Sequence, residues 1–415
     1  MTAQKGPLKG LRVLEIGSSV AGPFCGRLLA DFGAEVIKVE PIEGDPVRSM
    51  SKRVNGRSLY AASIFRNKRL AAIDLRVEAG RDLARRIAIR SDIVIENFRP
   101  GTLEKWGMDY ETLARENPKL VLVRISGFGQ SGPYRDRAGY GIIGEAVSGL
   151  RHLTGDADRP PSRINTSLTD EVTGLYAAFG AMMAIVARQS SGRGQCVDAT
   201  LYESAFSMIE PHVPAFDALG IVAHRAGSKL PDSTPNNLYA TRDGRDIHIT
   251  AMADSVFARL ADAMGKPELA TDPHYATAIA RSANDDALDA LITGWTLGRD
   301  LPDLEKVLEE AGVPASRIYD MTDIFRDPHY RARDMLLEVP DPELGSLTVA
   351  GVVPKLSATP GSVMHLGGAT GSDTASVLRD VLALTPEQIR TLSAQGAIFC
   401  AEAQTSRSAQ SQGAE

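Results

Sequence analysis

One aspartate, Asp170, combines a reactive group with a position that favours its ionised form. It lies in the run NTSLTDEVTGLYAAFGAMM (165–183), directly before an apolar helix predicted over Val172–Arg188. The free N–H groups and the positive dipole end of a helix N-terminus stabilise a carboxylate. An ionised carboxylate can attack a thioester carbonyl and form a mixed anhydride. Asp170 is therefore a candidate nucleophile. It is equally a candidate helix N-cap, because aspartate is among the best capping residues, and the two roles are compatible.

Basic residues near the ends of predicted strands and helices form the second candidate group. They are Arg48, the run Arg66-Asn67-Lys68-Arg69, Arg99, Lys105 and Arg124. One interpretation is a phosphate-binding rim at the carboxyl ends of parallel strands, and the other is a solvated surface. The formal net charge of −6 makes binding along a nucleic-acid backbone a poor main function, but allows a local pocket for a phosphorylated small molecule.

The elements that must position these residues follow an alternating pattern. Helical spacing separates short apolar runs, which we predict to be buried strands, at Leu11–Ile16, Glu35–Glu40, Ile93–Glu96 and Leu120–Ile125. A helix is predicted over Pro23–Phe32, ending at Gly33. Strands alternating with helices indicate an α/β fold with a parallel sheet.

The first strand–helix–strand unit invites a dinucleotide-binding interpretation that its loop does not support. Glu40 ends the second strand, where a ribose-binding carboxylate would lie. The connecting loop, however, reads GSSVAGPFCG in place of GxGxxG, and Pro23 removes one backbone donor for a pyrophosphate. We therefore expect a different ligand on this scaffold.

Cysteine usage and terminal composition restrict the class of protein further. Cys25, Cys196 and Cys400 form no CxxC pair, which suits a reducing cytosol and predicts a cytoplasmic protein. The N-terminus has no secretory h-region, and we find no run of about 18 apolar residues that would span a membrane. The scattered histidines suggest no metal site, and no GxSxG, HExxH or P-loop motif occurs.

Several segments, taken in order, resemble the class III CoA-transferase family (the CaiB/BaiF type, which includes succinyl-CoA and formyl-CoA transferases). They are LKGLRVLEIGSSVAGPFCGRLLADFGAEVIKVEPIEGDPVR, RNKRLAAIDL, DIVIENFRPGTLEKWGM, ISGFGQSGPYRDRAGYG, LTDEVTGLYAAFGAMMAIVARQSSGRGQCVDATLYESAF, YATRDGRDIHI and LEEAGVPASRIYDMTDIFRDPHYRARDM. The likeness extends over about residues 8–380.

The resemblance implies a CoA-transferase that transfers coenzyme A from an acyl-CoA donor to a carboxylic acid, and the habits of the family suggest succinyl-CoA as the donor. Asp170 would carry aspartyl anhydride and aspartyl-CoA thioester intermediates. CoA thioesters would be substrates, with no permanently bound cofactor. The positions that match CoA-binding positions of the family are Val20, Ala21, Lys68, Arg69, Leu75, Asn97, Phe98, Arg99, Lys105 and Tyr140.

The resemblance also implies an architecture. The expected Rossmann-like large domain combines residues 1–205 with a return linker and C-terminal part at 326–400, and a smaller α+β domain spans 236–325. Residues 206–235 contain several prolines and charged residues with no clear periodicity, and we expect them to be a linker. The polar residues 401–415 are expected to be a disordered tail. Two chains would form an interlocked homodimer, with neither nucleic acid nor membrane as a partner.

Three departures from the family pattern bear on the chemistry. Gly141 stands where an acidic residue is common, and Glu145 is four residues further on. The segment Thr370–Leu378 differs from the usual C-terminal stretch. The glycine run of oxalate-using formyl-CoA transferases is absent, which disfavours that substrate pair.

Alternatives and substrate contacts stay open at this level. An acyl-CoA racemase of the same fold is disfavoured, because Tyr140 replaces the histidine that proton abstraction would use. A non-catalytic CoA-binding protein is a further alternative. Oxyanion donors are unassigned, with Gly127, Gly129 and Gly141 as candidates. An acceptor's second carboxylate would need an Arg or Lys from the small domain to neutralise it, and Arg225 and Lys229 lie near that domain in sequence.

Overall fold

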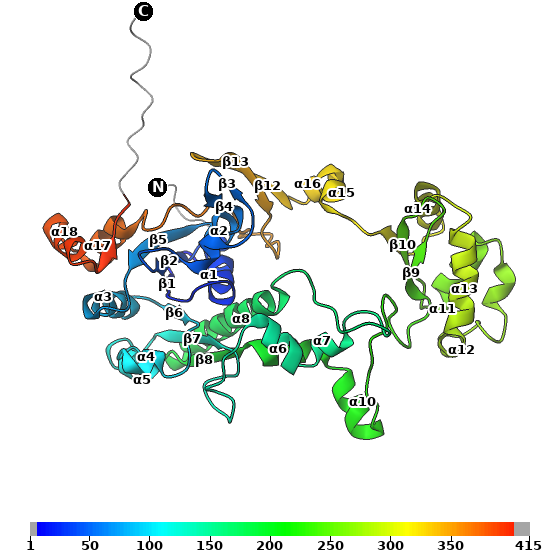
Figure 1. The fold of residues 1–415 in the computed structure, drawn as a ribbon, viewed down its shortest axis with the longest axis horizontal. Helices are drawn as coiled ribbons and strands as arrows, with labels where there is room; N and C mark the ends of the chain where they lie inside the picture. The colour runs from blue at the N-terminus through cyan, green and yellow to red at the C-terminus, as the bar shows by residue number, and fades with distance from the viewer. Residues whose placement is uncertain (1–5, 402–415) are drawn as a thin grey trace, which may run out of the picture. The chain divides into compact units, whose positions relative to one another are not determined.

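The computed structural model describes residues 6–401, which form two compact units. The first unit contains residues up to 150, 165–213 and those from 329 onward, and the second contains 151–164 and 214–328. Figure 1 shows the chain coloured from its N-terminus to its C-terminus. The predicted tail lies outside the described residues from 402 onward.

A mostly parallel sheet forms the centre of the first unit (Figure 1). Its order is β14-β5-β2-β1-β6-β7-β8 in the described residues. The strands are β1 (Arg12–Glu15), β2 (Glu35–Glu40), β5 (Lys68–Ile73), β6 (Ile93–Glu96), β7 (Val121–Ser126), β8 (Cys196–Thr200) and β14 (Ile398–Phe399). The first six run parallel, and β14 pairs antiparallel with β5. The order of the parallel strands is that of doubly wound sheets: successive strands are added on one side of β1 as far as β5, and then on its other side from β6 onward.

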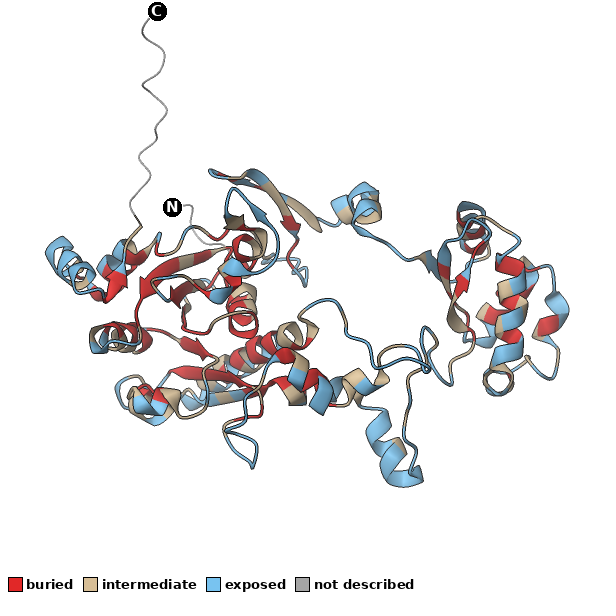
Figure 2. Cartoon of the chain, viewed as in Figure 1, coloured by how far each residue is buried: buried red, intermediate tan, exposed pale blue. Residues whose placement is uncertain are grey.

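Helices cover both faces of this sheet. One face packs on α1 (Ala21–Asp31) and α8 (Leu168–Ser191), and the other on α3 (Glu78–Ala88), α4 (Thr102–Lys105), α5 (Tyr110–Glu116) and α17 (Thr374–Leu382). The predicted apolar runs are the buried strands, coloured red in Figure 2. Further elements of this unit are α2 (Leu59–Ile64), α6 (Gly141–Val147), α9 (Leu201–Phe206), α18 (Pro386–Ala394) and the hairpins β3–β4 (Arg53–Val54, Arg57–Ser58) and β12–β13 (Leu336–Asp341, Gly345–Ala350).

Small residues let α8 approach α1 closely. Ala177, Ala181 and Ala184 are buried against the sheet, and a Cβ on Gly174 would lie 2.8 Å from the carbonyl oxygen of Ala21. By length and composition, α8 is also apolar enough to cross a membrane, which the sequence analysis did not anticipate. A core helix passes the same test, and α8 packs on α1, β7 and β8.

The second unit is built on an antiparallel sheet, β11-β10-β9 (Ala315–Arg317, Asp246–Thr250, Asn236–Ala240). Its helices are α11 (Asp254–Ala263), α12 (Ala278–Ala283), α13 (Asp285–Thr296), α14 (Leu301–Glu310) and α15 (Met321–Arg326). The buried core includes Tyr239, Phe257, Leu260 and Ile292. The turn at Asp243-Gly244 joins β9 to β10, as its sequence predicts.

Three short helices fall where the chain passes between the units: α7 (Leu150–Leu153), α10 (His212–Leu219) and α16 (Pro328–Ala332). Helix α10 lies within residues 206–235, the segment that the sequence analysis expects to be a linker. Pro214 is in the first turn of α10, where a missing N–H breaks no intrahelical bond. Its surface is exposed (Figure 2).

Candidate functional site

A pocket of about 250 Å³ opens at the carboxyl ends of β1, β6 and β7. Its lining comes from six parts of the first unit, and the residues are Ser18–Ala21, Asn97–Pro100, Ile125–Gly127, Arg135 with Arg137–Tyr140, Asp170 and Leu201. The strand order reverses between β1 and β6, so the loops that follow these two strands lead to helices on opposite faces of the sheet. A crevice is left between the two loops at this edge. Ligands of open α/β sheets bind at such a position.

Asp170 reaches the pocket from the first turn of α8. The helix begins at Leu168, so Asp170 is its third residue and Ser167 is the N-cap. This corrects the interpretation of Asp170 as the capping residue. The carboxylate still lies in the turn where helix N–H groups favour negative charge.

The backbone of Gly141 packs directly against Asp170. A Cβ on Gly141 would lie 2.2 Å from Oδ2 and 2.9 Å from Cγ of Asp170. No side chain fits there while the carboxylate keeps its position. The glycine that departs from the family pattern is therefore matched to the placement of Asp170. Glu145, on the next turn of α6, is buried.

Asn97 holds the loop that follows β1 from two sides. Its Oδ1 accepts a hydrogen bond from the N–H of Ser18 at 2.7 Å, and its Nδ2 donates to the carbonyl of Ser18 at 2.8 Å. The next N–H, of Ser19, donates to Asp45 at 3.1 Å. Ser19 has a φ of 65°, a strained value for serine that these bonds help to hold. Val20 and Ala21 follow and line the pocket.

A buried cluster of charges lies behind this loop. Lys38 pairs with Asp45 at 2.8 Å and donates to the carbonyl of Gly17, while Lys68 donates to Glu15 at 2.7 Å. Burial opposes the charge of Lys38, but Asp45 and Glu15 outweigh it and raise the pKa of Lys38. Breaking such a pair leaves an uncompensated buried charge, so the cluster fixes the shape of the loop.

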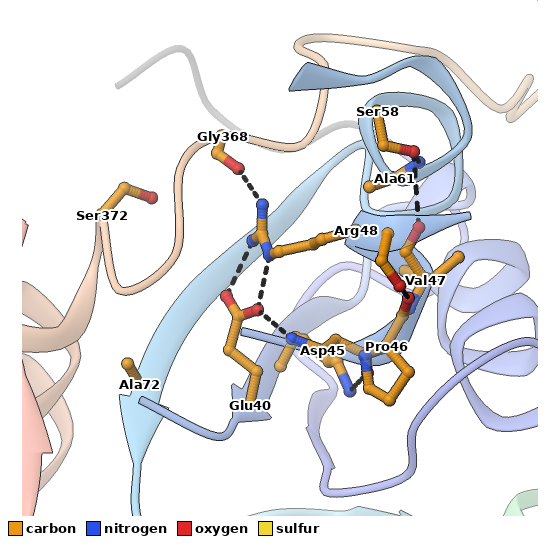
Figure 3. Close-up of polar contacts among 12 residues, drawn as sticks. Glu40, Asp45, Pro46, Val47, Arg48, Ser58, Ala61, Ala72, Gly368 and Ser372 are labelled. Atoms are coloured by element: carbon orange, nitrogen blue, oxygen red, sulfur yellow. Dashed lines mark hydrogen bonds and ion pairs between the residues drawn. The ribbon is translucent and has the colours of Figure 1, made fainter. Parts of the chain in front are cut away.

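Glu40 and Arg48 extend this cluster toward the C-terminal segment. Arg48 donates to both carboxylate oxygens of Glu40, at 2.7 and 2.8 Å, and to the carbonyl of Gly368 at 3.0 Å (Figure 3). Glu40 also accepts from the N–H of Asp45 at 3.1 Å. Glu40 is buried and bidentately paired, so it presents no free carboxylate to a ribose.

Most of the predicted basic rim is internal. Arg66 forms a buried pair with Asp31, and Arg124 bridges Glu96 and Glu104. Lys68 is fully buried and Arg69 pairs with Glu35 and Asp380. These residues form internal ion pairs, so neither expected interpretation, a phosphate-binding rim or a solvated surface, describes them. Arg99 lines the pocket, whereas Lys105, exposed at the end of α4, does not.

The remaining predicted site residues divide in the same way. Phe98 lines the pocket and packs edge-on against Trp106, with 5.0 Å between ring centroids. Tyr140 lines it and is 75% exposed. Leu75 packs on the hydrophobic core beyond β5 and is not among the lining residues.

Glu96, which precedes Asn97, helps to shape the second loop of the pocket. It accepts a hydrogen bond from the N–H of Phe98 at 2.7 Å. Burial raises the pKa of Glu96 to about 7, although Arg124 opposes this shift. The loop conformation therefore depends on a carboxyl group that titrates near neutral pH.

Other candidates from the sequence have structural partners. Lys229 pairs with Asp285, Asp286 and Asp289 in the second unit. Arg225 donates to the backbone carbonyls of Asp156 and His152. In Thr370–Leu378, Asp373 and Thr374 accept hydrogen bonds from N–H groups of β5, so this segment attaches α17 to the sheet.

Two arginines of the pocket were missed by the sequence analysis. Arg135 and Arg137 lie on the segment joining β7 to α6 and line the pocket with Asp170. The only sequence signal was their place in GPYRDRAGYG, directly before Tyr140. Within residues 6–401, no group of three or more His, Cys, Asp or Glu side chains could hold a metal ion.

Comparison with known proteins gives one consistent result. The model of the family described as CoA-transferase family III matches residues 8–374. The chain is 48% identical over 394 residues to a succinyl-CoA–D-citramalate CoA-transferase of Chloroflexus aurantiacus, covering 94% of this chain and 98% of the relative. It is 39% identical over 391 residues to the beta subunit of a succinyl-CoA–L-malate CoA-transferase of the same organism, covering 93% and 96%.

A solved structure agrees with these relatives. The crystal structure of a CAIB/BAIF family protein from Brucella suis is similar with a TM-score of 0.80 and 34% sequence identity. The similarity covers 91% of this chain and 100% of that one.

Proposed function

The chain belongs to CoA-transferase family III, and from this premise we propose that it transfers coenzyme A from succinyl-CoA to a small dicarboxylic acid of the citramalate or malate type. The single observation that carries this proposal is the 48% identity to a succinyl-CoA–D-citramalate CoA-transferase over nearly its whole length. The pocket supports it, because a carboxylate and an open crevice occur together at the carboxyl edge of the sheet.

Asp170 acts as the nucleophile in the proposed mechanism. Its carboxylate attacks the succinyl thioester carbonyl, and the thiolate of CoA leaves as the aspartyl–succinyl anhydride forms. The thiolate then attacks the aspartyl carbonyl of the anhydride, which gives an aspartyl-CoA thioester and free succinate. The acceptor carboxylate attacks this thioester and releases the thiolate again. Attack of the thiolate on the acceptor's carbonyl yields the new CoA thioester and restores the Asp170 carboxylate.

The loop residues supply the environment for these steps. Val20 and Ala21 begin α1 at the pocket, where N–H groups lack intrahelical partners. Such donors stabilise the oxyanion of each tetrahedral intermediate. Asn97, Phe98 and Arg99 also line the pocket, and we propose that they contact the pantetheine arm of CoA. Lys68 acts through Glu15 and the loop and does not contact a phosphate.

The proposed activity is tested by measuring CoA transfer from succinyl-CoA to separate acceptors. D-citramalate, L-malate and acetate are the acceptors, and the products are resolved by liquid chromatography with mass detection. The proposal predicts transfer to at least one of the two hydroxy-dicarboxylates and little to acetate. Hydrolysis without transfer, or transfer only to acetate, would contradict it.

We also propose that the chain forms an interlocked homodimer in the cytoplasm. The observation in favour of a partner chain is an apolar stripe on α8, where Leu175, Phe179, Met183 and Val186 recur on one face and are between 48% and 58% exposed. Exposed stripes of this kind occur at protein interfaces. Light scattering of wild type beside Phe179→Asp tests the pairing. We expect a dimer that the substitution weakens, and a monomeric wild type would contradict it.

A further inference from the structure

The pocket carries more positive charge than the proposed nucleophile balances. Its charged lining residues are Arg99, Arg135, Arg137 and Asp170. Arg135 lies 3.5 Å from the exposed carboxylate of Asp136, a weak surface pair. In the part of the chain that the structure describes, neither Arg99 nor Arg137 has a carboxylate within ion-pair distance. The pocket is therefore suited to an anionic group in addition to the reacting carboxyl.

Arg137 is held in place by an aromatic stack. Its guanidinium lies over the ring of Tyr134, 3.6 Å from the centroid. Tyr134 in turn packs edge-on against Phe128, with 5.9 Å between centroids, and Phe128 is buried. Stacking occupies the flat face of a guanidinium and leaves its N–H edge available. This arrangement lowers the entropy that an incoming anion must remove.

The segment that carries Arg137 is anchored at both ends. Gly127 and Gly139 touch, since a Cβ on Gly139 would lie 2.7 Å from the Cα of Gly127. Near the start, the N–H of Gly129 donates to Ser126 at 2.9 Å and that of Gln130 to Asp198 at 2.8 Å. The stacked arginine is thus fixed to the strand β7 whose end forms the pocket.

We propose that Arg137 binds the distal carboxylate of a dicarboxylic acyl group while Asp170 reacts with the other carboxyl. This assignment rests on the proposed function and names its specificity-determining residue. A guanidinium edge matches a carboxylate with two parallel hydrogen bonds. Lys229 and Arg225, the basic residues that the sequence suggested for this role, already have partners in the second unit.

A phosphate of CoA is the other anion that could meet Arg137, and the experiment separates the two. Exchange of labelled succinate into succinyl-CoA is compared with exchange of labelled butyrate into butyryl-CoA. These acids have the same chain length, and only succinate has a second carboxylate. Binding of free CoA is measured by calorimetry. The variants are Arg137→Gln, Arg137→Lys and the matched control Arg390→Gln, an exposed arginine on α18 outside the pocket.

For Arg137→Gln we expect a 10- to 100-fold fall in kcat/KM for succinate exchange, mainly through KM, and less than about threefold for butyrate. CoA affinity and the control should stay within about twofold of wild type. Arg137→Lys should recover only part of the loss, because lysine lacks the planar edge.

Three results would overturn the inference in different ways. Equal loss for both acids together with weaker CoA binding would assign Arg137 to a phosphate. Unchanged succinate exchange would show that Arg137 binds neither group. Absence of succinate exchange in the wild type would refute the proposed function itself, and the inference with it.

Discussion

Replacing Gly141 by alanine tests how closely the backbone of α6 sets the position of Asp170. The new Cβ would lie 2.2 Å from Oδ2 of Asp170, whereas ordinary contact begins near 3.4 Å. The carboxylate must therefore move by about 1 Å or rotate away from the pocket. A misplacement of about 1 Å at a reacting group costs on the order of 100-fold in rate. We expect CoA transfer by Gly141→Ala to fall by about that factor.

The stability of this variant should not fall with its activity. Gly141 opens α6, where alanine is favoured over glycine by about 0.5–1 kcal/mol, and its φ is one that alanine adopts. We expect the free energy of unfolding, from urea titration, to stay within about 1 kcal/mol of wild type, and CoA binding to persist.

A matched control separates this effect from general glycine replacement. Gly294 lies within α13, and a Cβ there would meet nothing within 4 Å. Gly294→Ala should keep full activity. If Gly141→Ala transferred CoA within twofold of wild type, the argument that this glycine is matched to the position of Asp170 would be refuted.

Three further variants test the groups around the pocket. Lys68→Met leaves Glu15 buried without its closest cation, so the free energy of unfolding in urea should fall by about 3–5 kcal/mol. The affinity for CoA should stay within about threefold of wild type. Weaker CoA binding at unchanged stability would instead show that Lys68 contacts a phosphate of CoA. The pKa of Glu96 is raised to about 7 from 4.5, so its ionisation should lower the free energy of unfolding by about 3 kcal/mol as the pH rises through this window. Glu96→Gln should make the free energy of unfolding less dependent on pH over the same range. Identical profiles of stability against pH for wild type and variant would contradict the raised pKa. Asn97→Ala removes both hydrogen bonds to Ser18 and should lower the free energy of unfolding by about 1–3 kcal/mol. An unchanged midpoint of urea unfolding would show that the loop keeps its conformation without Asn97.

The central sheet could be predicted from the sequence because its strands are short, apolar and separated by helical spacing. The structure confirms Glu35–Glu40 and Ile93–Glu96 at the predicted bounds, and the α/β class with them. The antiparallel strand β14 was not predicted. Two residues, Ile398 and Phe399, carry no periodic signal, and only their pairing with β5 identifies them.

The candidate site was predictable where residues follow a strand end. Val20 follows β1 and Asn97 follows β6, and neighbouring parallel strands bring their carboxyl ends together. Lys68 differs, because it opens β5 at the amino end, opposite Val36, and its ammonium points to Glu15. Sequence spacing does not reveal which basic residues find an internal partner.

The arginine on the segment before α6 could not be found by the same reasoning. Arg137 belongs to no helix or strand, so no periodicity places it. Its position depends on the stack of Tyr134 and on the contact of Gly127 with Gly139, which join parts of the chain through packing. Such contacts appear only in three dimensions.

Intact-protein mass spectrometry after mixing with succinyl-CoA tests the central claim most directly. The account predicts a mass increase equal to CoA less water, or to the succinyl anhydride, after acid quench, with peptide mapping that assigns it to Asp170. Asp170→Ala should show no adduct and no transfer, while keeping its fold and CoA binding. An adduct or normal transfer in Asp170→Ala would contradict the assignment of Asp170 as the nucleophile.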